Sequence, residues 1–139
     1  MSSRIQDAIE AVNDILEANV PNVIKAYDYP VDQLFDERCV MTYYGGGEVM
    51  SETADWERGL HNIICDFIVF RKDLARDMQL LMTDIDEIFD ALVSDPTFSN
   101  TVSTYEQVSC SDPINSQWAG QPIVILRFTI ENVKLLYTT

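Results

Sequence analysis

The chain has 139 residues, 47% of them hydrophobic, and a formal net charge of −14 at pH 7 from 23 acidic and 9 basic residues. This length suits one domain with a single core, and the hydrophobic content excludes global disorder. The charge argues against a nucleic-acid-binding protein, because such binding relies on Lys and Arg to displace counterions from phosphates, and it makes copies of the chain repel one another.

The sequence has no sign of a targeting or membrane segment. Its first residues, MSSRIQDAIEAVND, include acids where a signal peptide would be apolar, and no run of about 18 apolar residues occurs. We therefore expect a protein made in the cytoplasm that does not enter a membrane. Cys39, Cys65 and Cys110 lack CxxC spacing, so reduced, buried thiols are expected rather than a disulfide framework.

Residues 4–18 predict an amphipathic helix. At about 100° per residue, the apolar side chains fall in one arc and the polar ones, including Asn13, in the opposite arc. Ser3 and Gln6 have the spacing of a capping box, which satisfies backbone groups of the first turn.

Three strands are expected next. The segment VIKAYDYP, residues 23–30, is rich in β-branched and aromatic residues and ends at a proline, which cannot donate to a ladder. A second strand covers residues 39–44. The third, LHNIICDFIVF at residues 60–70, has apolar residues on both parities toward its end, which is typical of a central strand with both faces covered.

Between the second and third strands, residues 45–59 predict a long mobile loop. Gly45, Gly46 and Gly47 are not followed by the Lys and Ser/Thr of a phosphate-binding loop. We interpret the glycines as part of a loop that becomes ordered on meeting a partner, with Trp56 as its large anchor; a plain flexible connection is the alternative.

From residue 73 to 93 the apolar spacing becomes helical again. The acidic residues Asp84, Asp86, Glu87 and Asp90 are spread around the helical wheel, so we expect a solvated surface and not one metal site. Weak binding of Mg²⁺ between subunits is the one cofactor left open.

Two closing strands are predicted at residues 101–111 and 122–136, joined by the loop SDPINSQWAGQ, which contains Trp118. In the last strand, apolar residues of even number from 124 to 130 form one face, and Arg127 lies on the other.

Together these elements predict an α+β fold in which two helices pack on one face of a mostly antiparallel, four- to five-stranded sheet. We expect a single domain over residues 1–139. The apolar residues on both parities of strand 60–70 suggest that a neighbouring subunit covers the other face of the sheet.

The sequence offers little chemistry. The only histidine, His61, is expected to be a partly exposed residue at a strand end. It lies four positions from Cys65, roughly 13 Å along a strand, so the two cannot form a nucleophile and base. We predict no catalytic, cofactor-binding or metal-binding residues.

Basic residues gather in the stretch FIVFRKDLARDM. Arg71, Lys72 and Arg76 lie near a helix N-terminus, where cations are mildly unfavourable, so helix stability does not explain them. They are either neutralised locally by Asp73 and Asp77 or reach an acidic patch on another copy of the chain. The candidate interface residues are Arg71, Lys72, Arg76, Gly45, Gly46, Gly47, Trp56 and Trp118.

The order of elements resembles the tail terminator proteins of long-tailed bacteriophages, also known as minor tail or tail completion proteins. The likeness lies in the opening helix, VIKAYDYP, a glycine-containing loop, the join FIVFRKDLARDMQLL and a closing strand pair with IVILRFTIENV. It spans nearly the whole chain and consists of pattern and order, not of a catalytic motif.

The resemblance implies a structural virion protein without enzymatic activity. Such a subunit forms a hexameric ring on the finished tail tube, stops tube polymerisation and presents a surface for head–tail joining. Its partners would be other copies of the chain, the tail tube protein and a head completion or connector protein, while DNA passes through the lumen without specific binding. It would reside at the head-proximal end of the tail after assembly in the host bacterial cytoplasm.

Three alternatives stay open. The first is a head completion or connector-joining protein. The second is a small divalent-metal-dependent hydrolase that uses the acidic residues of the second helix. The third is an acidic inhibitor that mimics nucleic acid.

Overall fold

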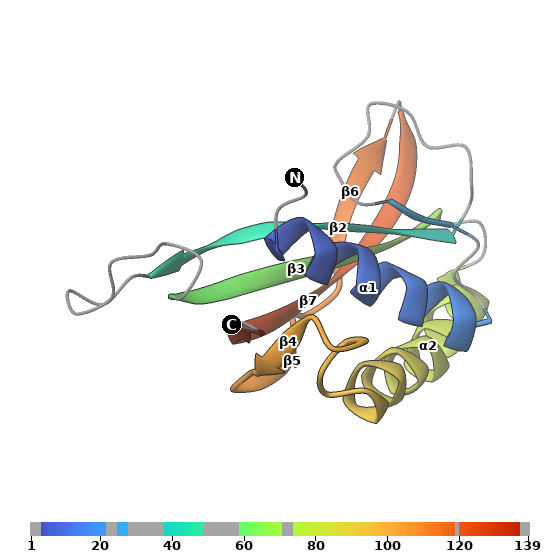
Figure 1. Ribbon diagram of the computed structural model, residues 1–139. Helices are drawn as coiled ribbons and strands as arrows, with labels where there is room; N and C mark the ends of the chain where they lie inside the picture. The colour runs from blue at the N-terminus through green and yellow to red at the C-terminus, as the bar shows by residue number, and fades with distance from the viewer. Residues whose placement is uncertain are drawn as a thin grey trace.

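The computed structural model describes residues 4–21, 25–27, 38–48, 59–70, 74–118 and 120–136 (Figure 1). Both predicted helices are confirmed, each within one residue of its expected bounds: α1 (Arg4–Asn19) and α2 (Leu74–Ser94). The strands are β1 (Lys25–Tyr27), β2 (Arg38–Glu48), β3 (Leu60–Phe70), β4 (Val102–Thr104), β5 (Gln107–Cys110), β6 (Ile114–Trp118) and β7 (Gln121–Leu135).

The seven strands of the described residues form one sheet. Its order is β1-β2-β3-β7, and β4, β5 and β6 pair in turn along the other edge of β7. β1 and β2 are parallel, and the other pairs are antiparallel. The sheet is therefore mixed, and it curves into a half-barrel. In Figure 1, α1 crosses in front of β2 and β3.

The expected four- to five-stranded, mostly antiparallel sheet with two helices on one face is wrong. The segment 101–111, expected as one strand, is divided into β4 and β5, and the loop expected after it contains β6. β7 has 15 residues, which is long enough to pair with all three short strands. Its register shifts near Asn132, which has a φ of 54°, a conformation that asparagine tolerates better than most residues.

β6 escapes prediction because its sequence, INSQW, does not alternate between apolar and polar residues. Strand preference depends strongly on pairing partners. Here the partner is β7, with Ile114 opposite Ile125 and Trp118 opposite Gln121. Gly120 lies in the connecting turn with a φ of 83°, which glycine adopts without strain.

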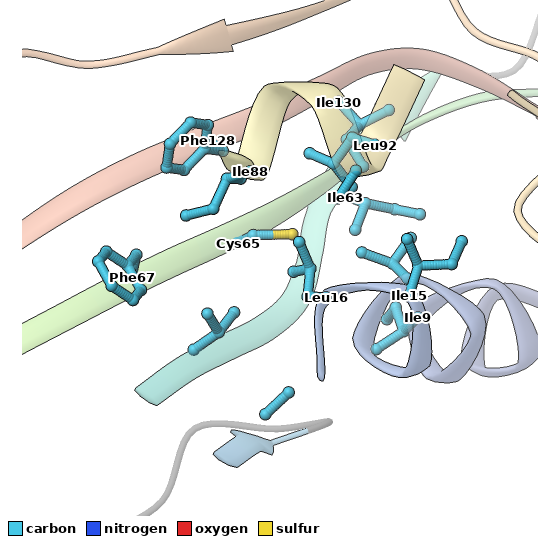
Figure 2. Packing of buried hydrophobic residues seen from close by; sticks show 14 of the residues in the cluster. Ile9, Ile15, Leu16, Ile63, Cys65, Phe67, Ile88, Leu92, Phe128 and Ile130 are labelled. Carbon is cyan, nitrogen blue, oxygen red and sulfur yellow. The ribbon is translucent and has the colours of Figure 1, made fainter. Parts of the chain in front are cut away.

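The main hydrophobic core lies between the helices and one set of strand side chains (Figure 2). Leu16 of α1, Leu92 of α2 and Phe67 of β3 are fully buried. Phe89 packs edge-on against Phe128 with ring centroids 5.3 Å apart. Each such side chain contributes about 1.5 to 3 kcal/mol on burial. The predicted alternation along the last strand is confirmed, since the buried members of this core on β7 include Val124, Leu126, Phe128 and Ile130.

A second, smaller cluster lies on the opposite face of the sheet. It explains the apolar residues on both parities of strand 60–70, because they are covered within one chain. A neighbouring subunit, which we expected on this face, is not needed to bury them. The members are Cys39, Met41, Ile68 and Ile123, with Tyr27, Phe70 and Ile125 packed against them.

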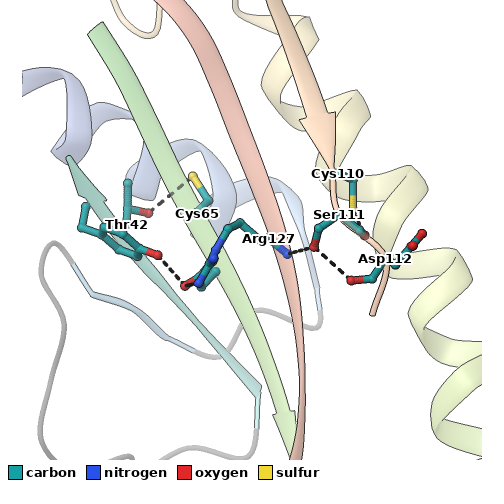
Figure 3. Close-up of polar contacts among 8 residues, drawn as sticks. Thr42, Cys65, Cys110, Ser111, Asp112 and Arg127 are labelled. Carbon is teal, nitrogen blue, oxygen red and sulfur yellow. Dashed lines mark hydrogen bonds and ion pairs between the residues drawn. The ribbon is translucent and has the colours of Figure 1, made fainter. Parts of the chain in front are cut away.

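Asn13, expected on the polar side of the first helix, is buried. The Thr42 hydroxyl of β2 donates to Asn13 Oδ1 at 2.5 Å. It also lies 3.6 Å from Cys65 Sγ (Figure 3). A buried amide without a partner would cost about 1 to 3 kcal/mol, so this pairing lets α1 pack closely over β2 at a polar position. A helical wheel does not include a partner from another element.

Candidate functional surface

The predicted interface residues fall in different parts of the molecule. Gly45, Gly46 and Gly47 belong to β2, Trp118 ends β6, and Arg76 lies in α2. In the sheet order, β3 and β7 separate β2 from β6, so the glycines and Trp118 do not come together. The side chains of Arg76 and Trp118 are not among those described. The predicted interface residues outside the described part of the chain are Trp56, Arg71 and Lys72.

The structure places the three glycines in an irregular part of β2, which extends to Glu48 and not only to Tyr44. The register with β3 shifts between Tyr44 and Gly47, as in a β-bulge. Gly46 has a φ of 97°, in the region that favours glycine. The remainder of the predicted loop, residues 49–58, lies outside the described residues.

His61 lies against this bulge and is 1% exposed, so the expectation of a partly exposed histidine is wrong. A hydrogen bond of 2.8 Å joins its Nδ1 to Tyr44 Oη. A Cβ on Gly47 would stand 2.5 Å from that oxygen, 2.7 Å from the nitrogen and 2.7 Å from the backbone oxygen of Leu60. The third glycine is therefore required for space, because the Tyr44–His61 pair and the backbone of Leu60 leave no room for a side chain.

We expect Gly47→Ala to destabilise the protein by about 1 to 3 kcal/mol, because the new methyl group must displace the Tyr44–His61 pair. The measurement is the free energy of unfolding from a urea titration monitored by circular dichroism. The double variant Tyr44→Phe/Gly47→Ala lacks the closest clashing oxygen, so it should cost less than the sum of the two single changes. Additive costs would contradict this account.

Across the other face of the sheet, three side chains form a polar triad: Tyr43 of β2, Asp66 of β3 and Arg127 of β7. Arg127 Nε donates to Asp66 Oδ1 at 2.8 Å and Arg127 Nη2 to Oδ2 at 3.2 Å, while the Tyr43 hydroxyl donates to Oδ2 at 2.7 Å. Asp66 and Arg127 are directly opposite in the β3–β7 ladder. The Asp66 side chain is 10% exposed and that of Arg127 43%.

Two members of the triad, Tyr43 and Arg127, keep their protons at neutral pH. Burial, followed by the hydrogen bond to Asp66, raises the pKa of Tyr43 to about 12. The hydrogen bond to Asp66 also raises the pKa of Arg127. Neither group exchanges a proton near neutrality, so the arrangement is suited to hold three strands in register rather than to acid–base catalysis. The sequence contains a signal for this triad that was missed: Asp66 is a single aspartate inside an apolar strand, and such a residue needs a partner.

Alkaline unfolding tests the triad. Between pH 10 and about 12 an unfolded tyrosine loses its proton while Tyr43 keeps its own, so the stability that Tyr43 contributes is present below pH 10 and is lost as the pH rises to about 12. We expect Tyr43→Phe to cost about 1 kcal/mol at pH 8, through loss of one hydrogen bond. The difference in free energy of unfolding between Tyr43→Phe and the unmodified protein, measured with urea, should then shrink toward pH 12. A difference that stays constant with pH would contradict this role of Tyr43.

The acidic residues of α2 do not form one site. Asp84 is fully buried, contrary to the expected solvated surface, whereas Asp86 and Asp90 are exposed. Within the described residues no three His, Cys, Asp or Glu side chains are placed to hold a metal ion. α2 packs against α1, and the spread of its acidic residues on a helical wheel does not reveal which of them is buried.

Glu87 lines a polar hollow near the C-terminal ends of both helices. The hollow has a volume of about 260 Å³, and one carboxylate oxygen of Glu87, Oε2, is buried without a hydrogen bond in the described structure. Its other lining residues are Asn19, Asp90, Ala91 and Ser94.

The three cysteines are thiols and not disulfides, and Cys39 and Cys65 are buried as expected, while Cys110 is partly exposed. Burial raises the pKa of Cys65 to about 12 and also raises that of Cys110. Thiols in this state are poor nucleophiles at neutral pH.

The longest uncharged stretch of the sequence, residues 113–126, contains β6, Gly120 and the first part of β7. We call it the β6–β7 arm. Residues 114–117 and 120–122 are exposed, and the arm projects beyond the rest of the sheet in Figure 1. An otherwise acidic molecule thus presents one exposed, uncharged strand.

Two other large apolar side chains are highly exposed, Met82 and Val93 of α2. They share their helix with the exposed carboxylates Asp86 and Asp90. A like-charged partner would meet these carboxylates on α2 but not on the arm.

Comparison with protein-family models and with curated proteins yields no match. Of the two helices in the described chain, neither combines the length and apolar character needed to cross a membrane.

Proposed function

We propose that this chain is a structural subunit that assembles with copies of itself, and specifically a tail terminator of a long-tailed bacteriophage. The observation that carries the proposal is the exposed, uncharged β6–β7 arm on a chain of net charge −14. Copies with the same strong charge can associate only where like charges are absent or paired. The likeness in element order to tail terminators supplies the biological setting for such assembly.

In this proposal, the chain forms a hexameric ring at the head-proximal end of the tail. The ring stops polymerisation of the tail tube protein and offers a surface to a head completion or connector protein. Carboxylates around the lumen repel DNA phosphates, so DNA passes without being held. The virion is thus the proposed location.

The hydrolase alternative has less support. Asp84 is buried and Asp86 exposed, so these carboxylates do not face one common site. The only histidine of the chain is buried against Tyr44. The head-completion alternative shares the features of a tail terminator. Co-purification distinguishes the two: a tail terminator should bring down the tail tube protein, and a head completion protein should bring down the connector.

Virions assembled without this protein provide the direct test. If the chain ends tube growth, electron micrographs should show abnormally long tails that are not attached to heads. Restoring the gene on a plasmid should restore normal tails. Tails of normal length that fail to join heads would favour the head-completion alternative, and normal virions would refute both.

The basic cluster can be tested in the same setting. We expect Arg71→Glu/Arg76→Glu to leave the subunit folded but to reduce ring formation on tail tubes, because two contacts with acidic neighbours become repulsive. Circular dichroism checks folding, and native mass spectrometry checks assembly. The single variants Arg71→Glu and Arg76→Glu are compared with Lys134→Glu, which makes the same change of charge at an exposed cation on β7. Unchanged assembly would assign the cluster to local pairing with Asp73 and Asp77.

A further inference from the structure

Two exposed apolar side chains lie on one side of α2, the yellow-green helix of Figure 1. Met82 is 64% exposed and Val93 54%, more than any other large apolar residue described. They are eleven positions apart, which is about three helical turns, so both point to the same side of the helix, about 16.5 Å apart along its axis. A single exposed apolar residue is common, but an aligned pair gives a partner two points of contact.

The same side of α2 is acidic. Asp86 lies four positions after Met82, and Asp90 lies three positions before Val93. Residues three or four positions apart are neighbours on a helix, so each apolar side chain has a carboxylate beside it. Both carboxylates are exposed. We call Met82, Asp86, Asp90 and Val93 the α2 face, and any molecule that covers it must approach two negative charges.

The polar hollow continues the α2 face, because Asp90 belongs to both. Glu87 also lines the hollow, and its Oε2 atom is buried without a hydrogen bond in the described structure. Buried carboxylate oxygens are seldom left in this state, because the loss of hydration is costly. A hydrogen-bond donor from another molecule would remove that cost.

The ends of both helices make the hollow more negative. α1 ends at Asn19 and α2 at Ser94, and both residues line the hollow. The C-terminus of a helix carries about half a negative charge, and neither helix has a basic residue in its last turn. The volume of about 260 Å³ is many times the roughly 10 to 15 Å³ that one water molecule needs. The hollow therefore has the charge and the size to receive a cationic side chain.

Charge selects the kind of partner. Ammonium and guanidinium groups donate strong hydrogen bonds to carboxylates, and amide and hydroxyl oxygens accept from them as well. A copy of this chain, with a net charge of −14, is repelled by an acidic face, whereas a protein rich in Lys and Arg is attracted to it. Apolar contacts three turns apart match the apolar stripe of a second helix that lies along α2.

We propose that the α2 face and the polar hollow bind a basic amphipathic helix of another protein. The apolar stripe of that helix covers Met82 and Val93, and one of its Lys or Arg side chains enters the hollow and pairs with Glu87. The inference goes beyond the proposed function, because it does not require self-assembly. It assigns α2 to a different protein and leaves the β6–β7 arm to copies of the chain.

Fluorescence anisotropy of a labelled peptide, titrated with the full chain, tests the surface. The probe peptide is a helix with a stripe of Leu flanked by Lys, and a scrambled peptide of the same composition is the control, because it keeps the charge and loses the stripe. At about 0.1 M NaCl the Kd of the probe peptide should be at least about tenfold lower than that of the control. Binding should weaken at about 1 M NaCl, where the Debye length is only about 3 Å. Equal affinities of the two peptides would overturn the inference.

Variants of the carboxylates locate the bound cation. Glu87→Gln should raise the Kd of the probe peptide about tenfold, through loss of a hydrogen bond to a charged group. Asp90→Asn, at an exposed position, should raise it about two- to fivefold. Asp112→Asn, the same change at an exposed position between β5 and β6, is the control and should leave the Kd unchanged. Equal Kd values for Glu87→Gln and Asp112→Asn would overturn the inference.

The stability of Glu87→Gln separates binding from a structural role. Because the change removes an unpaired buried charge, its free energy of unfolding in urea should be no lower than that of the unmodified chain. A carboxylate that only supports the fold would instead lower it on replacement. If Glu87→Gln does not fold, the inference fails on this point, and Asp90→Asn still reports on binding.

Met82→Gln/Val93→Thr tests the apolar contacts, since both changes keep the approximate size of an exposed side chain. The Kd of the probe peptide should rise to that of the scrambled peptide, while the circular dichroism spectrum of the chain stays the same. An unchanged Kd would overturn the inference.

Two further measurements exclude other occupants. MgCl₂ should displace the probe peptide no better than NaCl of the same ionic strength; stronger displacement would assign the hollow to a divalent cation. Sedimentation velocity of the chain alone should not change with Glu87→Gln, and self-association that this variant abolishes would assign the α2 face to a second copy. Either result would overturn the inference, while the proposed function, which is tested in virions, would stand.

Discussion

β7 is the strand on which the rest of the sheet depends, because it is paired along both edges. Phe128, near its middle, lies opposite Cys65 of β3 on one side and Cys110 of β5 on the other. Its apolar side chains enter the main core, and Ile123 enters the smaller cluster on the opposite face. Without β7, the strands β4, β5 and β6 would each be too short to exist alone.

β2 is held differently, by polar contacts. Three consecutive residues, Thr42, Tyr43 and Tyr44, each hydrogen-bond to a side chain of another element, and they alternate between the two faces of the sheet. Buried polar groups that are fully paired favour one register over its neighbours, since a slip by one residue would leave all three groups unpaired. The bulge at the glycines begins directly after these anchors, so its position along β3 is defined.

The helices could be predicted because their apolar period is local information. The architecture could not, because β6 is a strand only through its pairing with β7, and the division of segment 101–111 follows from how that ladder runs. The same reason applies to single residues: Asn13, His61 and Asp84 were each expected to be at least partly exposed, and each is buried in the fold. For Asn13 and His61, one hydrogen-bond partner is a residue of β2. Of the candidate surface, charge led us to the basic residues near α2, while β6 was assigned to a loop.

The arm has a consequence for how this protein can diverge. Residues 114–117 are exposed and contribute little to either core, so their side chains can change without loss of the fold. In the proposed assembly, partner choice and folding would be encoded in separate parts of the chain. If the chain is a viral subunit, as proposed, two related viruses in one cell could keep the same scaffold yet produce subunits that do not mix, through a few substitutions on one five-residue strand.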